Sequence, residues 1–167
     1  SQIFNEKILN LLERGFIKST TVMINYVTKE QESQVTTLIE LNKQGNISVG
    51  LHVVFDLESP IPPQVEKQFK QFKNIFGVNP SHLDIHKSTK NIECINAIDS
   101  FARDHNLPVR HILIRPKTAH TTHPVFSTTP FDLSKAIRFL NGVNDGESCE
   151  ILCHPGDYDP NCKSRLN

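Results

Sequence analysis

Segments with helical and with strand periodicity alternate along the whole chain of 167 residues. Apolar side chains three and four residues apart predict five helices, and short runs rich in β-branched residues predict five strands. The predicted helices cover residues 3–14, 28–43, 62–77, 91–105 and 129–140. The predicted strands cover residues 19–25, 47–55, 81–86, 108–114 and 149–153, with a polar loop at 115–129. This alternation is typical of an α/β protein with a parallel sheet and right-handed crossovers.

The alternation begins with a helix and ends with a strand. A βα unit normally begins with a strand, and a complete (β/α) barrel takes about 250 residues. We therefore expect residues 1–167 to be a single, incomplete, barrel-like domain. Its first strand and its final helix or strand are expected outside this chain.

Charge and hydropathy exclude several classes of function. Lys and Arg number 18, as do Asp and Glu, so the chain has no strong positive field and a nucleic-acid partner is not expected. The apolar runs are too short to span a bilayer, and no apolar leader opens the chain, so we expect a cytoplasmic protein without a membrane partner. Its four cysteines form no CxxC pair and are expected to be reduced thiols.

Histidines gather where chemistry is expected in such a fold. Ligands of parallel α/β proteins bind at the carboxyl ends of the strands, and His52, His86 and His154 lie at or near three predicted strand ends. Alternation places His82, Asp84 and His86 on one face of their strand. Imidazole and carboxylate groups are common ligands of divalent metals, although each histidine alone could also be a hydrogen-bonded core residue.

Four motifs occur in order at the predicted strand ends. They are STTVMIN (19–25), GLHVVF (50–55), SHLDIH (81–86) and CHPG (153–156). In this order they closely resemble the motifs of the YdjC-like carbohydrate deacetylase family, which includes chitooligosaccharide deacetylases. The resemblance extends over residues 1–156.

The resemblance implies a (β/α)-barrel-like fold and a hydrolase that uses a divalent metal, Mg²⁺ or Zn²⁺. The implied substrate is an N-acetylated amino sugar or a short oligosaccharide, from which the enzyme removes acetyl by cleaving a linear amide. By motif position, His52 and His86 match metal ligands and His154 matches the proton donor. Three further residues match positions that support the site or contact the sugar: His82, Asp84 and Arg110.

Two departures from the family pattern keep other interpretations open. Family members begin with a strand that ends in Asp-Asp, and Ser1 aligns after that pair; residues 87–90 (KSTK) replace a histidine-rich stretch. The alternatives are a non-catalytic metal- or sugar-binding module, an inactive fragment, and a different metal hydrolase such as a phosphoesterase. An exposed apolar patch would indicate a homodimer.

Overall fold

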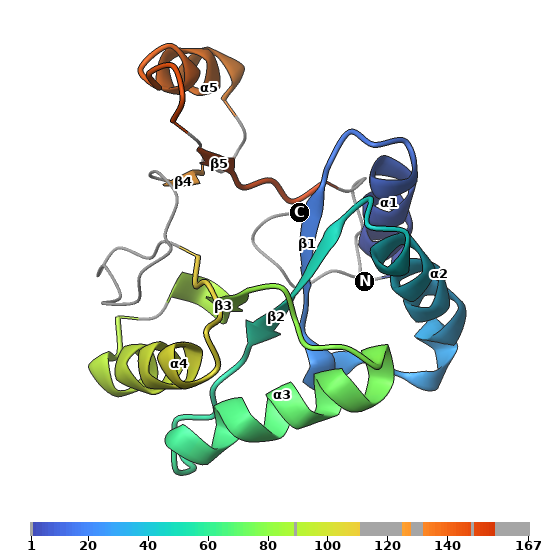
Figure 1. Ribbon diagram of the computed structural model, residues 1–167, viewed down its shortest axis with the longest axis vertical. Coiled ribbons are helices and arrows are strands. Elements are labelled where there is room, and N and C mark those ends of the chain that lie inside the picture. Colours follow the sequence, from blue (N-terminus) through green and yellow to red (C-terminus); the bar gives the residue numbers. More distant parts are fainter. Residues whose placement is uncertain (1, 89, 111–124, 128–131, 148, 156–167) are drawn as a thin grey trace.

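A parallel three-stranded sheet lies at the centre of the computed structural model, which describes residues 2–88, 90–110, 125–127, 132–147 and 149–155. The strands are β1 (Ser19–Val22), β2 (Ser48–Val53) and β3 (Leu83–Ile85), and they pair in chain order (Figure 1). An isolated parallel bridge from Leu83 to Val109 continues the same order. The predicted α/β class with a parallel sheet is confirmed, and the incomplete barrel-like arrangement stays a prediction.

Four helices form an arc around this sheet (Figure 1). They are α1 (Gln2–Glu13), α2 (Glu32–Lys43), α3 (Pro62–Phe76) and α4 (Ile92–Asp104). The core lies between the helices and the apolar side chains of the strands, such as Leu51 and Leu83, both fully buried. Because neighbouring side chains of a strand point to opposite faces, this packing leaves the polar side chains of the strands on the other face.

Local sequence signals explain where these helices begin and end. Pro62 occupies the first turn of α3, and Gly77 ends the helix in the left-handed conformation with φ +70°. The capping box predicted at Thr28 and Gln31 is present, although it opens a short 3-10 turn, η2 (Lys29–Gln31), that leads into α2. Asn91 caps α4 by accepting hydrogen bonds from two backbone N–H groups.

The strands are shorter than predicted. The ladder between β1 and β2 ends at Val22, and residues 24–26 turn into a 3-10 helix, η1 (Ile24–Tyr26), instead of extending the strand. Ile24 is fully buried there, so its apolar character reflects core packing rather than strand pairing. His86 similarly begins a 3-10 turn, η3 (His86–Ser88), directly after β3. Of the predicted strand at 108–114, the residues from 111 onward lie outside the described part.

The C-terminal segments form a second sheet. β4 (Val125–Phe126) and β5 (Glu150–Ile151) pair in parallel, and α5 (Leu133–Leu140) connects them. The prediction of a loop is therefore wrong for residues 125–126, where a strand partner supplied by distant residues stabilises an extended segment. β5 pairs with β4 rather than with the first three strands. Figure 1 shows α5 well apart from the arc of the other helices.

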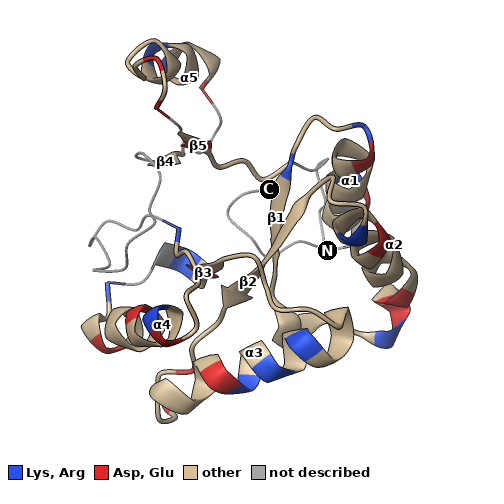
Figure 2. Ribbon diagram, viewed as in Figure 1, with Lys and Arg blue, Asp and Glu red and all other residues tan. Residues whose placement is uncertain are grey.

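The charge distribution on the surface and the length of the helices fit what the balanced charge and the short apolar runs of the sequence indicate. Figure 2 shows acidic and basic side chains interspersed on the helices that surround the sheet. No helix within the described ranges combines the length and the apolar character that crossing a bilayer demands. Among the described residues, Cys94, Cys149 and Cys153 are free thiols, and the fourth cysteine, Cys162, lies outside the described part.

Candidate active site

The register of the sheet places the candidate residues of β2 and β3 side by side. His52 lies directly opposite Asp84, and Gly50 lies opposite Thr21 of β1. All four belong to the face of the sheet that points away from the helices, since their neighbours Leu51 and Val53 are buried in the core. Two sequence motifs separated by about thirty residues thus meet because the strands are parallel and adjacent.

Asp84 is the centre of the site and is only 2% exposed. One of its oxygens, Oδ1, contacts Nδ1 of His52, and the other, Oδ2, accepts hydrogen bonds from Nη1 of Arg110 and, at 3.3 Å, from the hydroxyl of Thr21. Burial alone would raise the pKa of Asp84, but the hydrogen bond and electrostatic interaction with His52, together with the charge of Arg110, hold it below the ordinary value. Asp84 is therefore a buried carboxylate.

The carboxylate orients the imidazole of His52. An ionised carboxyl group only accepts hydrogen bonds, so Nδ1 of His52 carries the proton and Nε2 points away from Asp84. Nε2 lies 3.2 Å from Nδ1 of His86, and the two rings meet edge to face at 82°. Burial lowers the pKa of His86, and electrostatic interactions with His52 and Lys87 lower it further. The structure thus brings together the two histidines that sequence motifs suggested as metal ligands.

Arg110 connects this cluster to the second sheet. Its Nη1 contacts Asp84, while its Nε donates a hydrogen bond of 2.5 Å to Oε1 of Glu150 on β5. Only 15% of the Arg110 side chain is exposed. Sequence reasoning included Arg110 but missed Glu150 and Thr21. The only signal for these two was their position, within the CHPG-ending strand and within the STTVMIN motif, respectively.

His154 follows β5 and is exposed at the edge of the site. Partial burial lowers the pKa of His154, and electrostatic interactions with His52 and Arg110 lower it further, so its ring lies within electrostatic reach of both. The final glycine of the CHPG motif lies outside the described residues.

His82 shares the face of Asp84 but takes no part in the hydrogen bonds of that carboxylate. Its Nδ1 lies 2.8 Å from the hydroxyl of Ser81, and its ring covers Gly50. Burial lowers the pKa of His82, partly offset by the charge of Asp84. The structure therefore places His82 beside the cluster, packed against the backbone of β2.

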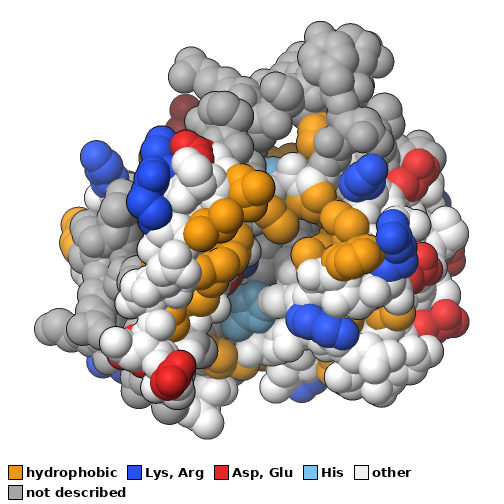
Figure 3. Space-filling model, turned by 90° about the horizontal axis from the view of Figure 1, so that it is seen from above, with side chains coloured by type: hydrophobic (Ala, Val, Ile, Leu, Met, Phe, Trp, Pro, Cys, Tyr) orange, Lys and Arg blue, Asp and Glu red, His pale blue; other side chains and the backbone are white. Residues whose placement is uncertain are grey.

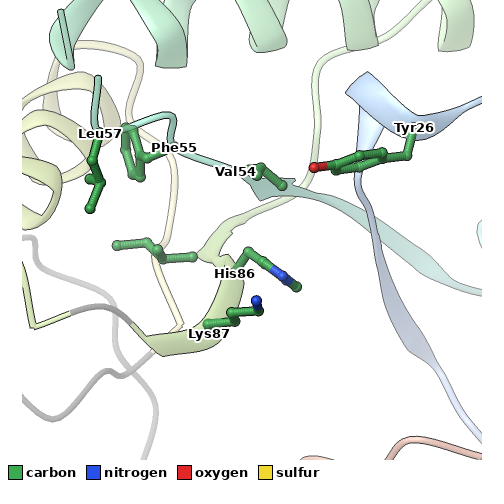
Figure 4. Close-up of a pocket in the computed structure, with 7 residues that line it drawn as sticks. Tyr26, Val54, Phe55, Leu57, His86 and Lys87 are labelled. Atoms are coloured by element: carbon green, nitrogen blue, oxygen red, sulfur yellow. The ribbon is translucent and has the colours of Figure 1, made fainter. Parts of the chain in front are cut away.

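A pocket of about 370 Å³ lies next to His86 (Figure 4). Its walls come from η1, from the segment that follows β2 and from the end of β3: Tyr26, Val54, Phe55, Leu57, Ile85, His86 and Lys87. Lys87 has a φ of +60°, an uncommon conformation for a residue with a side chain. In space-filling view, hydrophobic side chains lie on both sides of a hollow in which a histidine is visible (Figure 3).

The donor set suits a metal ion only in part. Two imidazole nitrogens face one another, and the ring of one is held by a carboxylate, as is usual for metal-binding histidines. Within the described ranges, however, no group of three or more His, Cys, Asp or Glu side chains is arranged to hold a metal. His52 and His86 would thus supply two ligands of a larger set.

Comparison with known proteins assigns the family. The model of the YdjC-like protein family matches residues 63–166, more than half of the chain. The chain belongs to the YdjC family. The matched range contains Asp84, His86, Arg110, Glu150 and His154.

Curated YdjC-like relatives cover nearly the whole chain at low identity. A protein of Clostridium beijerinckii named carbohydrate deacetylase is 25% identical over 95% of this chain and 78% of its own length. The carbohydrate deacetylase of Geobacillus stearothermophilus is 21% identical, covering 93% of this chain and 74% of the relative. A chitooligosaccharide deacetylase of Proteus mirabilis is 24% identical, and the matched region covers 93% of this chain and 76% of the relative. The family suggested by the strand-end motifs is therefore confirmed.

Proposed function

We propose that this YdjC family member is a metal-dependent hydrolase that removes the acetyl group from an N-acetylated amino sugar or short oligosaccharide. The observation that carries the proposal is the 3.2 Å separation between Nε2 of His52 and Nδ1 of His86. Zinc–imidazole bonds are about 2.0–2.1 Å long, so two nitrogens that share one ion lie roughly 3 Å apart. The names of the relatives support a deacetylase reaction.

His52 and His86 would hold the divalent ion. Asp84 fixes the ring of His52 through Nδ1. The lone pair of Nε2 is then directed toward the place between His52 and His86 where the ion would bind. Imidazole ligands favour Zn²⁺ over Mg²⁺, which prefers oxygen. When bound, such an ion polarises the acetyl carbonyl and lowers the pKa of a coordinated water.

His154 is the proposed proton donor to the sugar nitrogen. An amine leaves readily only when its nitrogen is protonated, and a positioned imidazole contributes about 10²–10⁴-fold to such a step. His154 follows β5, whose Glu150 bonds to Arg110, and electrostatic interactions with His52 and Arg110 lower its pKa, which supports a place beside the proposed ligands. The attacking water also releases a proton, which a carboxylate such as those of the Asp-Asp pair of the family would accept. The site would then use separate groups for holding the metal and for moving each proton.

The pocket beside His86 is the proposed place for the sugar. The rings of Tyr26 and Phe55 offer apolar faces, whereas His86 and Lys87 offer polar groups. A mostly apolar pocket with a few polar groups is typical of small-molecule sites. Figure 4 shows the labelled side chains around one shared space, with the imidazole of His86 on one side of it.

Acetate release tests the proposal. The protein is incubated with N,N′-diacetylchitobiose after treatment with a chelator, and again after addition of Zn²⁺ or Mg²⁺. We expect acetate only with a metal, and a loss of at least about 100-fold in the His52→Ala variant, because loss of a ligand itself should cost more than the about 10–100-fold that is typical for loss of a group that orients a ligand. His105→Gln is the matched control, because this imidazole contacts Phe69 and Phe101 instead of Asp84.

The outcomes separate the candidate functions. Acetate release that does not depend on a metal would contradict metal dependence. Binding of metal and sugar without acetate release would contradict the hydrolase and favour a binding module. Acetate release from the His52→Ala variant at the wild-type rate would contradict the assigned ligand.

A further inference from the structure

Glu150 is the charged residue of the site that neither the motifs nor the comparisons assign. It lies on β5, outside the sheet that carries His52 and Asp84, and its Oε1 accepts the Nε–H of Arg110 at 2.5 Å. A line of contacts therefore runs from Glu150 through Arg110 and Asp84 to His52. Every member of the line is at least two-thirds buried, since Glu150, the most exposed, is 31% exposed.

The two oxygens of Asp84 are divided between different partners. Oδ1 contacts His52, while Oδ2 contacts Arg110 and Thr21. This division is unusual for an arginine, because the guanidinium fork matches a carboxylate and tends to bind both oxygens at once. Arg110 instead presents Nη1 to Asp84 and turns Nε toward Glu150.

We infer that Glu150 is a positioning residue that keeps Arg110 from taking both oxygens of Asp84 and thereby leaves Oδ1 to orient His52. If Glu150 were absent, Nε of Arg110 would lose its carboxylate partner inside a mostly buried cluster. The guanidinium of Arg110 could then regain a carboxylate partner by rotating so that it also contacts Oδ1 of Asp84. There it would compete with Nδ1 of His52. The ring of His52 would then be free to turn or to change tautomer.

The same ion pair places His154. Glu150 precedes His154 by four residues in the chain, so its bond to Arg110 fixes the strand that ends at the proposed proton donor against the sheet that carries the proposed ligands. This consequence rests on the proposed function, whereas the effect on the His52 ring does not. Glu150 itself touches neither His52 nor His86 in the described contacts.

The test observes the His52 ring directly, in protein labelled with ¹⁵N-histidine and kept free of metal. His52→Gln assigns the ring signals. In wild type we expect one tautomer with the proton on Nδ1. In Glu150→Ala we expect the His52 signals to move toward a mixture of tautomers, with a smaller change of the same sign in Glu150→Gln. Glu66→Gln is the matched control, because it removes a surface ion pair with Lys70.

A second substitution distinguishes competition by the Arg110 guanidinium from a general loss of order around His52. Lysine cannot form the two-pronged contact, so Arg110→Lys introduced into Glu150→Ala should return the His52 signals toward those of wild type. Unchanged His52 signals in both Glu150 variants would overturn the inference, and so would a change that Arg110→Lys does not reverse. If Glu150→Ala fails to fold, Glu150→Gln carries the test.

Zn²⁺ affinity, measured by titration calorimetry, tests the proposed function and the role of Glu150 separately. We expect Glu150→Ala to weaken binding by about 10–100-fold, the usual effect of losing a group that orients a ligand. A wild-type protein that binds no Zn²⁺ and releases no acetate would contradict the proposed function, while the His52 signals would still decide the role of Glu150. Equal affinity in wild type and variant, with wild type active, would overturn only the role of Glu150.

Discussion

A Cβ atom at position 50 would lie 2.6 Å from the imidazole of His82, closer than real Cβ atoms approach other groups. Any side chain at position 50 would therefore force this ring to move, and the two residues form one packed unit on the polar face of the sheet. The glycine of the GLHVVF motif, which sequence reasoning noted only as part of a strand, allows this close approach.

Replacing Gly50 with alanine should destabilise the protein through this contact. Overpacking of a buried position costs about 1–3 kcal/mol, and we expect a loss in this range in urea denaturation. Gly142→Ala is the control, because its nearest neighbour would be an ordinary contact at 3.4 Å. His82→Ala combined with Gly50→Ala should recover part of the loss. Wild-type stability of Gly50→Ala would show that the ring moves freely.

Gln68 should be needed to hold the end of β2. This α3 side chain is 1% exposed, accepts a hydrogen bond from the N–H of Val54 and donates one to its C=O, at 3.0 and 2.8 Å. Gln68→Met keeps the length but leaves the partly buried N–H and C=O of Val54 without these partners, at a cost of up to about 1–3 kcal/mol each. We expect a lower free energy of unfolding. Because Val54 lines the pocket, KM for the sugar should also rise.

Gln71→Met on the same helix is a poor control, because the partly buried Gln71 side chain donates a hydrogen bond to the backbone C=O of Ile24. Lys67→Met is better matched, since it introduces the same side chain at a position without such a bond among the described residues. Equal stability of Gln68→Met and Lys67→Met would contradict a structural role for the Gln68 hydrogen bonds.

His154→Ala should separate turnover from metal binding. Loss of the proposed proton donor should lower kcat by about 10²–10⁴-fold. Zn²⁺ affinity should stay within a few-fold of wild type, since His154 makes no hydrogen bond to His52 or His86 in the described contacts. Calorimetry and acetate release on the same preparation check both values. A variant that turns over normally would remove His154 from the mechanism.

Stability should depend on the protonation of His82. Burial lowers the pKa of His82 in the folded protein below 6.5, so the unfolded chain binds more protons there. The free energy of unfolding should therefore be highest above about pH 6.5 and decrease as the pH falls through and below this value. His86 and His154 have lowered pKa values as well and act in the same direction.

A comparison of wild type with His82→Gln isolates the contribution of this residue. Urea midpoints are measured at about pH 7.5 and about pH 5.5, a range in which carboxyl groups with ordinary or lowered pKa values change little. The decrease between the two should be smaller in the variant. An equal decrease in both proteins would contradict the assignment to His82.

Much of the fold could be predicted because its signals are local. The stripe of Val65, Phe69, Phe72 and Phe76 recurs at helical spacing, and all four are buried in α3. Predictions were less accurate where pairing partners decide the structure. Residues 125–126 form a strand only because β5 lies beside them, and residues 24–26 leave the strand because the ladder with β2 has ended.

The candidate site divides in the same way. By itself, the sequence determined the order of the first four helices and first three strands, the family, and the residue types at the strand ends, because periodicity and motifs are properties of neighbouring residues. Only the tertiary structure decided that Asp84 shares its two oxygens between His52 and Arg110, and that Glu150 of another sheet holds Arg110. These contacts join residues 26 to 40 positions apart, and their geometry depends on strand register and on the burial of charge, which no local pattern encodes.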